Sequence, residues 1–467
     1  MLFSSLPFLY RFLPCVLMLY ALAPKKLKNA VLLLASLVFY AWGEPKYVLL
    51  MAASILAGYV FGLLIGLYRE KKPALAKLFL LLSVLTGVGS LACFKYADFF
   101  IENFNALTGL GLPLLRIALP IGISFYTFQL MSYEADVYRG TVEAQKNPID
   151  LGAYIALFPQ LIAGPIVRYS DINRQLSQRS SSMEDIALGI RRFILGLGKK
   201  VLIANSLGEL CAVYQSSAEG SVLFAWLYAI GFTLQIYFDF SGYSDMAIGL
   251  GRLFGFRFIE NFNYPYISGS ITEFWRRWHI SLGSWFRDYV YIPLGGNRVS
   301  KPRWFFNIFV VWMLTGFWHG AAWTFIIWGL YFAVLLVLEK LWLLKKLEKL
   351  GFLKHLYVLF FVTVSFVIFN ASNMNEAFAC LGDMFGLGRL PLSGSEALYC
   401  LKNYGFILLI AIVGATPLPA RAVAALKARG GEKAVNLLEL PALALLLLTV
   451  TAFLVDGSFN PFLYFRF

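Results

Sequence analysis

Long apolar runs separated by short basic segments constrain the fold of this chain more than any other feature. Of its 467 residues, 59% are hydrophobic and only 14% are charged. Runs of roughly 20 apolar residues cross a bilayer as helices, because the hydrocarbon core is about 30 Å thick. Lys and Arg gather in cytoplasmic loops, so the formal net charge of +14 indicates membrane topology, not nucleic-acid binding. The sequence therefore predicts an all-α polytopic membrane protein.

The apolar runs predict about 11 transmembrane helices, with re-entrant or interfacial helices between them. Basic clusters follow the first and third helices, which places these clusters in the cytoplasm and both chain termini outside. We see no internal repeat and no soluble domain. Residues 1–467 are therefore expected to form one transmembrane domain with an extracytoplasmic tail at 456–467. Single crossings are expected near residues 5–23, 29–43, 47–67, 75–94, 113–133, 187–212, 221–238, 356–370, 403–419 and 437–455.

Two segments are interrupted by proline and glycine. Residues 113–133 contain Pro113, Pro120 and Gly122, and a proline at membrane depth kinks a helix. Such broken helices line cavities, because the freed backbone groups need polar partners. Residues 151–168 are short and interrupted, and we expect them to form a re-entrant or interfacial hairpin.

An ionisable residue lies inside the apolar run that contains Trp312-Met-Leu-Thr-Gly-Phe-Trp-His-Gly-Ala-Ala-Trp323. Charged residues flank this run on both sides, and it is long enough for two short helical passes at about 1.5 Å per residue. Gly316 and Gly320 mark the turn or the close packing between the passes. This arrangement places His319 deep in the bilayer at the bend of a hairpin, where an ionisable side chain is a functional candidate. The alternative is a histidine that hydrogen-bonds between helices and serves packing.

Residues 271–289 have the pattern of one amphipathic interfacial helix, with aromatic anchors on one face and charged residues on the other. Arg276 and Arg277 belong to the charged face, and His279 lies at its border. The helix is either a surface anchor that binds anionic membrane lipids or a basic floor that receives a phosphorylated, anionic donor. The pattern alone leaves both interpretations open.

Two carboxylates, Asp239 and Asp245, follow the helix expected at 221–238 and lie among aromatic residues close to membrane depth. A charge there is costly unless it is paired or hydrogen-bonded. The pattern favours a structural polar network with Ser241, Ser244 or a nearby arginine over a direct catalytic role. The five cysteines are scattered and form no CxxC pair, so we expect neither a metal site nor a disulfide framework.

Long motifs that carry further information are spread over nearly the whole chain: Phe39-Tyr-Ala-Trp-Gly-Glu-Pro45, Leu119-Pro-Ile-Gly-Ile-Ser-Phe-Tyr-Thr-Phe-Gln129, Asp136-Val-Tyr-Arg-Gly140, Phe158-Pro-Gln-Leu-Ile-Ala-Gly-Pro165, Tyr237-Phe-Asp-Phe-Ser-Gly-Tyr-Ser-Asp245, Asn261-Phe-Asn-Tyr-Pro-Tyr266, Ile271-Thr-Glu-Phe-Trp-Arg-Arg-Trp-His-Ile-Ser-Leu282, Tyr291-Ile-Pro-Leu-Gly-Gly-Asn-Arg298 and Trp318-His-Gly-Ala-Ala-Trp323. Together they resemble the membrane-bound O-acyltransferase (MBOAT) family, most closely its alginate O-acetylation branch. One departure is Glu134, where the pattern has an apolar residue; a buried carboxyl there needs a partner.

The resemblance implies a ring of tilted helices around a funnel and tunnel. It implies that His319 matches the near-invariant family histidine and His279 the second one. It also implies transfer of an acyl group from a cytoplasmic thioester to an acceptor outside, usually with an extracytoplasmic SGNH-type partner. Donor binding is assigned to Arg276, Arg277, Asn297 and Arg298.

The chemistry of the histidines agrees with such a transfer. A neutral imidazole, with an ordinary pKa of about 6.5, suits a general base for a hydroxyl nucleophile. We therefore assign His319 as that base and His279 as the residue that orients the donor thioester. The sequence offers no nucleophilic Cys or Ser elbow, which favours direct transfer. However, Phe462-Leu-Tyr-Phe465 resembles a tail motif of teichoic-acid D-alanylation partners, so Tyr464 is a candidate acyl relay; the alternative is an aromatic belt at the interface.

We expect an O-acetyltransferase of the bacterial cytoplasmic (inner) membrane, with acetyl-CoA as donor substrate and no bound cofactor or metal. Its expected partners are an acyl-CoA or an acyl carrier protein, an SGNH-type enzyme, a polysaccharide acceptor and membrane lipids, but no nucleic acid. The alternatives are D-alanyl transfer from a carrier protein to teichoic acid, a transporter or flippase, and a non-catalytic scaffold. Asp239, Ser241 and Asp245 are expected as structural polar groups of the tunnel.

Overall fold

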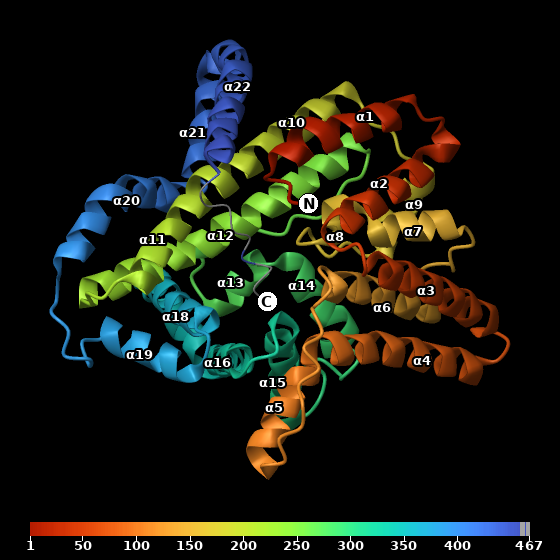
Figure 1. Ribbon diagram of the computed structural model, residues 1–467, viewed down its shortest axis with the longest axis horizontal. Coiled ribbons are helices and arrows are strands. Elements are labelled where there is room, and N and C mark those ends of the chain that lie inside the picture. Colours follow the sequence, from red (N-terminus) through yellow and green to blue (C-terminus); the bar gives the residue numbers. More distant parts are fainter. Residues whose placement is uncertain (458–462, 464–467) are drawn as a thin grey trace. The chain divides into compact units, whose positions relative to one another are not determined.

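The computed structural model of the protein describes residues 1–457 and residue 463; this part is helical and contains no strand. Its helices group into two compact units. Unit 1 contains residues 1–193 and 246–259, and unit 2 contains residues 194–245 and those from 260 onward (Figure 1). The predicted all-α fold is therefore confirmed. The long helices α10 (Met183–Gly198) and α12 (Val222–Leu253) each contribute residues to both units.

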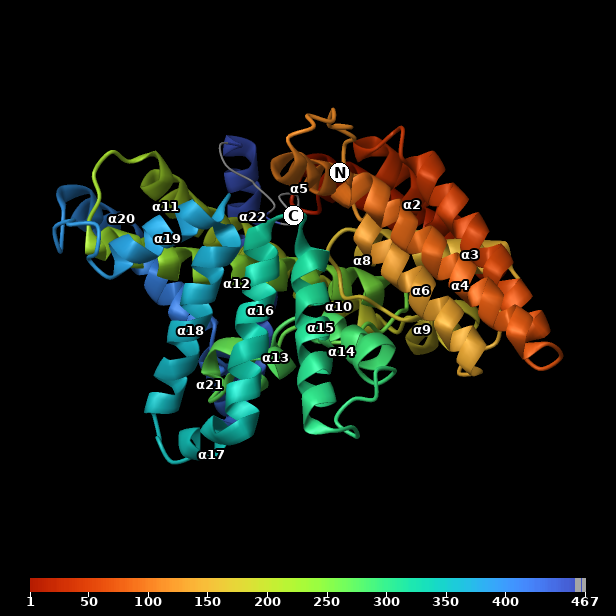
Figure 2. The ribbon, with the colours of Figure 1, turned by 90° about the horizontal axis from the view of Figure 1, so that it is seen from below.

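Unit 1 is built from short and medium helices, and three of them, α3, α4 and α6, pack against one another (Figure 2). Close approach is possible because Gly62 of α3 faces Tyr133 of α6, where a Cβ would lie only 2.7 Å from the ring. The α-helices that lie wholly within this unit are α1 (Leu13–Leu22), α2 (Lys28–Gly43), α3 (Val48–Tyr68), α4 (Pro73–Leu91), α5 (Ala97–Thr108), α6 (Ile123–Arg139), α7 (Pro148–Ala156), α8 (Phe158–Leu161) and α9 (Tyr169–Ser177).

The structure confirms both interruptions that the sequence predicts in unit 1. Residues 109–122 form no helix, and α6 begins only after Gly122, whose φ of 76° suits glycine. Residues 151–168 form the short helices α7 and α8 instead of one span, and both are buried. Glu134 is buried in α6, and its carboxyl hydrogen-bonds with Ser83 of α4.

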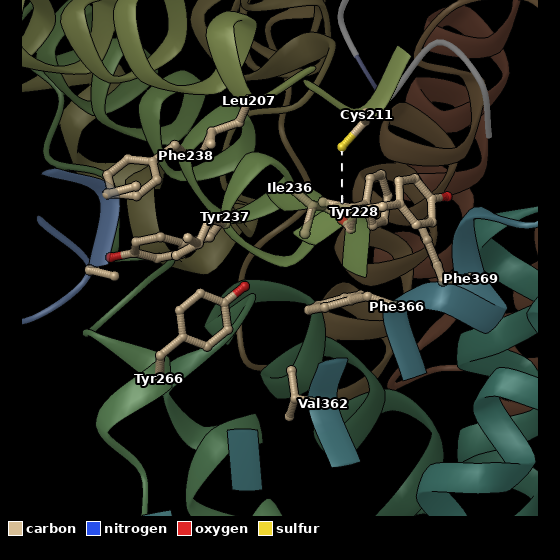
Figure 3. Packing of buried hydrophobic residues seen from close by; sticks show 14 of the residues in the cluster. Leu207, Cys211, Tyr228, Ile236, Tyr237, Phe238, Tyr266, Val362, Phe366 and Phe369 are labelled. Atoms are coloured by element: carbon tan, nitrogen blue, oxygen red, sulfur yellow. Dashed lines mark hydrogen bonds between the residues drawn. The ribbon is translucent and has the colours of Figure 1, made fainter. Parts of the chain in front are cut away.

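Unit 2 holds both candidate histidines. It contains η4 (Lys199–Ala204, a π-helix), α11 (Asn205–Ser216), α13 (Ile271–Arg277), α14 (Ile280–Phe286), α15 (Lys301–His319), α16 (Trp323–Leu338), α17 (Leu344–Leu347), α18 (Leu353–Asn370), α19 (Met374–Met384), α20 (Ser395–Gly414), α21 (Leu418–Leu426) and α22 (Glu432–Asp456). A large aromatic core joins α12 to α18. Figure 3 shows these side chains, among them Tyr228, Ile236, Phe366 and Phe369.

The predicted hairpin around His319 is confirmed. Helices α15 and α16 lie side by side and are joined by Gly320-Ala-Ala322 (Figure 2). Glycines let their backbones approach closely: the Cα atoms of Gly316 and Gly329 lie so near that a Cβ on either would stand 3.2–3.3 Å from the other. Small residues at a helix crossing are typical of packing in membranes, where close van der Waals contact holds helices together.

Several boundaries differ from the sequence prediction, and two of these differences concern the candidate site. The helix expected at 221–238 continues to Leu253, so Asp239 and Asp245 lie inside α12 and not after it. The amphipathic helix expected at 271–289 is broken: α13 ends at Arg277 and α14 begins at Ile280. Periodicity missed the break because apolar residues continue on both sides of it.

Seven helical segments in the described part are long and apolar enough to cross a membrane, which supports a multi-pass membrane protein. The helices α2 and α6, with 16 and 17 residues, fall below the length that defines these seven. The predicted number of about 11 crossings therefore stays a prediction. The seven segments are Val48–Tyr68, Pro73–Thr108, Val222–Leu253, Trp323–Leu347, Leu353–Asn370, Ser395–Gly414 and Leu418–Asp456.

Candidate active site

His319 is the last residue of α15, at the bend that leads into α16, and only 9% of its surface is exposed. Aromatic rings surround its imidazole edge to face. The ring centroids of Trp328 and Phe369 both lie 5.2 Å from it, at interplanar angles of 88° and 84°. These rings fix the orientation of the imidazole and exclude bulk water, and water exclusion strengthens electrostatic interactions at a reacting centre.

His279 lies in the break between α13 and α14, and 2% of its surface is exposed. Its backbone has φ 45° and ψ 53°, in the left-handed region that is costly for a residue with a side chain. Such strain persists at functional sites when the surroundings hold it in place. The break turns the histidine inward, whereas a continuous helix would have left it at the border of a surface face.

A polar network holds the His279 ring and assigns its tautomer. Its Nδ1 lies 3.1 Å from Asn261 Oδ1, which also accepts hydrogen bonds from the backbone N–H and hydroxyl of Ser281. The backbone N–H of Ser281 can only donate, so the atom that accepts it is the Asn261 amide oxygen, and the Asn261 amide nitrogen donates to Ser244 Oγ. Nδ1 therefore carries the proton, and Nε2 is left as an acceptor. Burial lowers the pKa of His279 to about 3, so its imidazole stays neutral at physiological pH.

Aromatic side chains connect the two histidines. The ring of Trp318 lies 6.0 Å from that of His279 and 4.9 Å from that of His319, centroid to centroid. Phe240 contacts the His279 ring edge to face at 4.7 Å and also lines a small cavity beside His319. The two histidines that the sequence singles out, 40 positions apart, are thus brought to one region of unit 2.

A cavity of about 460 Å³ opens at His279, within the 300–1,000 Å³ range of small-molecule sites. Its wall is largely apolar and includes Trp275, Trp312 and Leu336. Three exposed cations, Arg276, Arg287 and Lys340, also line it. An apolar chamber with cationic groups suits a ligand that has a thin neutral arm and an anionic head.

Of the four residues that the sequence assigns to donor binding, the structure places one at the cavity and three away from it. Only Arg276 lines the cavity. The Arg277 guanidinium instead bonds the Glu273 carboxylate at 2.9 Å and the Asn263 carbonyl oxygen. Asn297 and Arg298 are exposed in the turn after Pro293 and do not line the cavity. Arg287 and Lys340, the latter at the far end of the hairpin, line the cavity in their place.

A buried carboxylate anchors the broken helix to the hairpin. Glu339, which is 0% exposed at the end of α16, accepts hydrogen bonds from the backbone N–H groups of Ile271 and Thr272 at 2.6 and 2.8 Å. The Thr272 hydroxyl donates to it as well, at 2.7 Å. These bonds satisfy the free N–H groups at the start of α13. The anchor therefore fixes Trp275 and Arg276 relative to the hairpin.

The carboxylates of α12 pair with lysines, not with the serines or arginine that the sequence suggested. Asp245 pairs with Lys199 at 2.7 Å, and Asp239 pairs with Lys200 at 2.7 Å. Both lysines lie on the π-helix η4. Ser241 is buried beside them in α12, and Ser244 serves the Asn261 network. Asp239 additionally lines the small cavity at His319.

The small cavity beside His319 has a volume of about 20 Å³. Its wall includes Leu463, the one described residue beyond 457, and the Leu463 N–H donates to Asp239 Oδ2 at 3.0 Å. Tyr464, the candidate acyl relay, lies outside the described residues.

Sequence reasoning missed Asn261, Glu339, Lys200 and Lys340 as parts of this region. Asn261 lies in a quoted motif, and Lys200 lies in an apolar stretch where a charge is unexpected, so both left a signal. Glu339 and Lys340 looked like ordinary loop charges that end a span. Among the described residues, no group of three or more His, Cys, Asp and Glu side chains is placed to hold a metal ion.

Comparisons with known proteins identify relatives of this chain. The sequence profile of the MBOAT, membrane-bound O-acyltransferase family matches residues 91–380, which include both histidines. The chain is 41% identical to the probable alginate O-acetylase of Azotobacter vinelandii, over 100% of both chains. It is 46% identical to that of Pseudomonas aeruginosa, over 84% of this chain and 76% of the relative. It is 36% identical to the peptidoglycan O-acetyltransferase of Helicobacter pylori, over 84% and 81%.

Proposed function

Because the chain belongs to the membrane-bound O-acyltransferase family, we propose that it transfers acetyl groups from cytoplasmic acetyl-CoA across the membrane for O-acetylation of a cell-surface or secreted polysaccharide. The names of its relatives support an acetyl group and a polysaccharide or cell-wall acceptor. The whole chain, residues 1–467, acts as one such domain. It lies in the bacterial cytoplasmic membrane with both termini outside.

One observation carries the proposal: two buried histidines lie on neighbouring cavities, and the wider cavity is lined by cations. The adenosine diphosphate part of CoA is anionic and its pantetheine arm is narrow and neutral. Arg276, Arg287 and Lys340 suit the phosphates, since guanidinium and ammonium groups make charge-assisted bonds with phosphate. The apolar walls suit the arm. Arg277, Asn297 and Arg298 are weaker donor contacts, because none of them lines the cavity.

His319 acts as general base. It takes the proton from an acceptor hydroxyl, the freed oxygen attacks the thioester carbonyl carbon, and the carbon–sulfur bond breaks to release CoA as its thiolate, which is then protonated. Its aromatic enclosure keeps water from competing as the acceptor. His279 orients the donor. Since its Nε2 is an acceptor, it suits an N–H group of the pantetheine arm better than the thioester carbonyl oxygen.

The acetyl group continues to its acceptor in one of two ways. In the first, Tyr464 of the C-terminal tail takes it and passes it to an SGNH-type partner outside. Its chain neighbour Leu463 lines the His319 cavity, which supports this relay. In the second, the polysaccharide hydroxyl reacts directly, and the tail is an aromatic anchor at the interface.

Three alternative functions have less support. D-alanyl transfer from a carrier protein to teichoic acid is disfavoured because the three relatives above match 84% or more of this chain and carry O-acetyl names, whereas relatives named teichoic acid D-alanyltransferase match only 46–48% of it. A transporter, flippase or inactive scaffold is disfavoured because both histidines are present, are buried and line cavities.

The test uses the purified full chain in lipid nanodiscs with acetyl-CoA labelled in the acetyl group. We expect label on the protein, mapped by mass spectrometry to Tyr464. The variant Tyr464→Phe should lose both this label and polysaccharide acetylation, with unchanged size-exclusion behaviour. Full acetylation of the polysaccharide by Tyr464→Phe would exclude the relay. No use of acetyl-CoA, combined with use of a D-alanyl carrier protein, would exclude the proposed donor.

A second prediction concerns the cationic groups of the wide cavity. Arg276→Gln should raise the KM for acetyl-CoA about three- to tenfold and leave kcat nearly unchanged, because a ground-state ionic contact is lost. Arg277→Gln is the matched control, since the Arg277 guanidinium is held by Glu273 away from the cavity. Steady-state kinetics measure both. Equal effects of the two substitutions would contradict the assignment of Arg276.

A further inference from the structure

We propose that Asp239 and Lys200 form a buried docking site that binds the backbone of the chain's own C-terminal tail at Leu463. The proposal rests on the proposed function, in which the tail carries the acyl group on Tyr464. It assigns the α12 carboxylate a positioning role: it sets which residue of the tail reaches the His319 cavity.

The geometry divides the Asp239 carboxylate between two partners. One oxygen, Oδ1, lies 2.7 Å from Lys200 Nζ, and the other, Oδ2, accepts the Leu463 N–H at 3.0 Å. Lys200 Nζ also donates to Asn205 Oδ1 at 2.9 Å. Asp239 and Lys200 are each 2% exposed. A fixed, buried carboxylate oxygen thus points at a backbone donor of the tail.

Packing alone does not explain a buried ion pair at this position. Removing two charges from water is expensive, and apolar residues of similar volume often hold helices together equally well. Here α12 already approaches the segment that carries Lys200 through Gly242, where a Cβ would lie 2.8 Å from the Gly196 carbonyl oxygen. Lys200 also lies on a π-helix, a local irregularity that is frequent at functional sites. The pair therefore has a reason beyond helix packing.

The docking site and the proposed general base, His319, line the same small cavity. Asp239, Leu463 and His319 all line it, and Leu463 is only 6% exposed there. The bond to the Leu463 N–H holds the tail backbone at one point, the buried Leu463 side chain fixes which residue lies there, and the neighbouring side chain is left available for chemistry. Because Leu463 immediately precedes Tyr464, a dock at Leu463 would set the register of the proposed acyl carrier.

Three variants test the dock in the full chain in nanodiscs. Leu463→Pro removes the N–H donor, while Leu463→Ala keeps it and removes only the side chain. The double variant D239L/K200M replaces the pair with apolar residues, a change that usually preserves folding. Hydrogen–deuterium exchange of the C-terminal peptide reports docking without any need for activity. Transfer of label from acetyl-CoA reports function.

We expect exchange of the tail peptide to rise about tenfold or more in Leu463→Pro and in the double variant, but not in Leu463→Ala. Labelling of Tyr464 should fall in the same two variants, while their binding of acetyl-CoA persists. Unchanged exchange in both would overturn the dock. Faster exchange with undiminished labelling would overturn its positioning role. Absence of acetyl-CoA binding by the wild-type chain would instead count against the proposed function, so the two failures are distinguishable.

Discussion

The substitution His319→Gln should lower the rate of acetyl transfer by about 100- to 10,000-fold, the range that a positioned general base contributes. Glutamine has a similar length and remains polar, but it cannot take a proton from a hydroxyl group. The fold should persist, because Trp328 and Phe369 enclose the position whichever side chain it carries. The KM for acetyl-CoA should change little, since the donor cavity is lined by His279 and not by His319. Single-turnover transfer of labelled acetyl groups measures the effect.

The third histidine provides the matched control. His355 donates its Nδ1–H to the Ser268 carbonyl oxygen at 3.0 Å and lies outside both cavities. His355→Gln should keep transfer within about threefold of wild type, as expected for a position away from the reacting atoms. If both glutamine variants lost activity alike, a general need for histidine in folding would explain the result, and the catalytic role of His319 would be refuted.

The lengths of the apolar runs and the positions of proline and glycine predicted the helical hairpin and the two interrupted segments. The hairpin around His319 follows from one apolar run that is too long for one pass and carries glycine near its middle. The interruptions at 113–122 and 151–168 follow from proline and glycine chemistry, which acts within a few residues. The resemblance of long motifs to a family gave the enzyme class, which the family match bears out.

Features that depend on contacts between distant segments could not be predicted. The helical wheel for 271–289 assumes an unbroken helix, but tertiary contacts compete with it. The Asn261 carbonyl oxygen accepts the Ile280 N–H beside the break, and Glu339, 68 positions from Ile271, holds the start of α13. Asn261 accepts a hydrogen bond from the His279 ring, and Lys200 forms an ion pair with Asp239. A periodic pattern carries no information about such partners. For the same reason the sequence assigned Arg277 to the donor site, because it cannot tell which of two adjacent arginines a nearby carboxylate holds.

The close contact between α15 and α16 predicts the largest structural effect of a small substitution. Gly316→Ala should prevent correct formation of the hairpin, because its Cβ would lie 2.2 Å from the Phe325 carbonyl oxygen. Backbone atoms on both sides leave no flexible side chain that could move away. Overpacking in a well-packed core costs about 1–3 kcal/mol and more where the backbone must shift. His319, three residues further on, would lose its position together with the hairpin.

Gly405→Ala in α20 is the control, because no atom lies within 4 Å of a Cβ at that position. It should leave the protein unchanged or slightly stabilise it, since alanine favours helix over glycine by roughly 1 kcal/mol. Thermal unfolding in nanodiscs and size-exclusion chromatography would show a lower midpoint or aggregation for Gly316→Ala only. A Gly316→Ala protein with normal unfolding and normal transfer would mean that the two helices have room to separate, and the tight hairpin would then not be what fixes His319 beside Trp328 and Phe369.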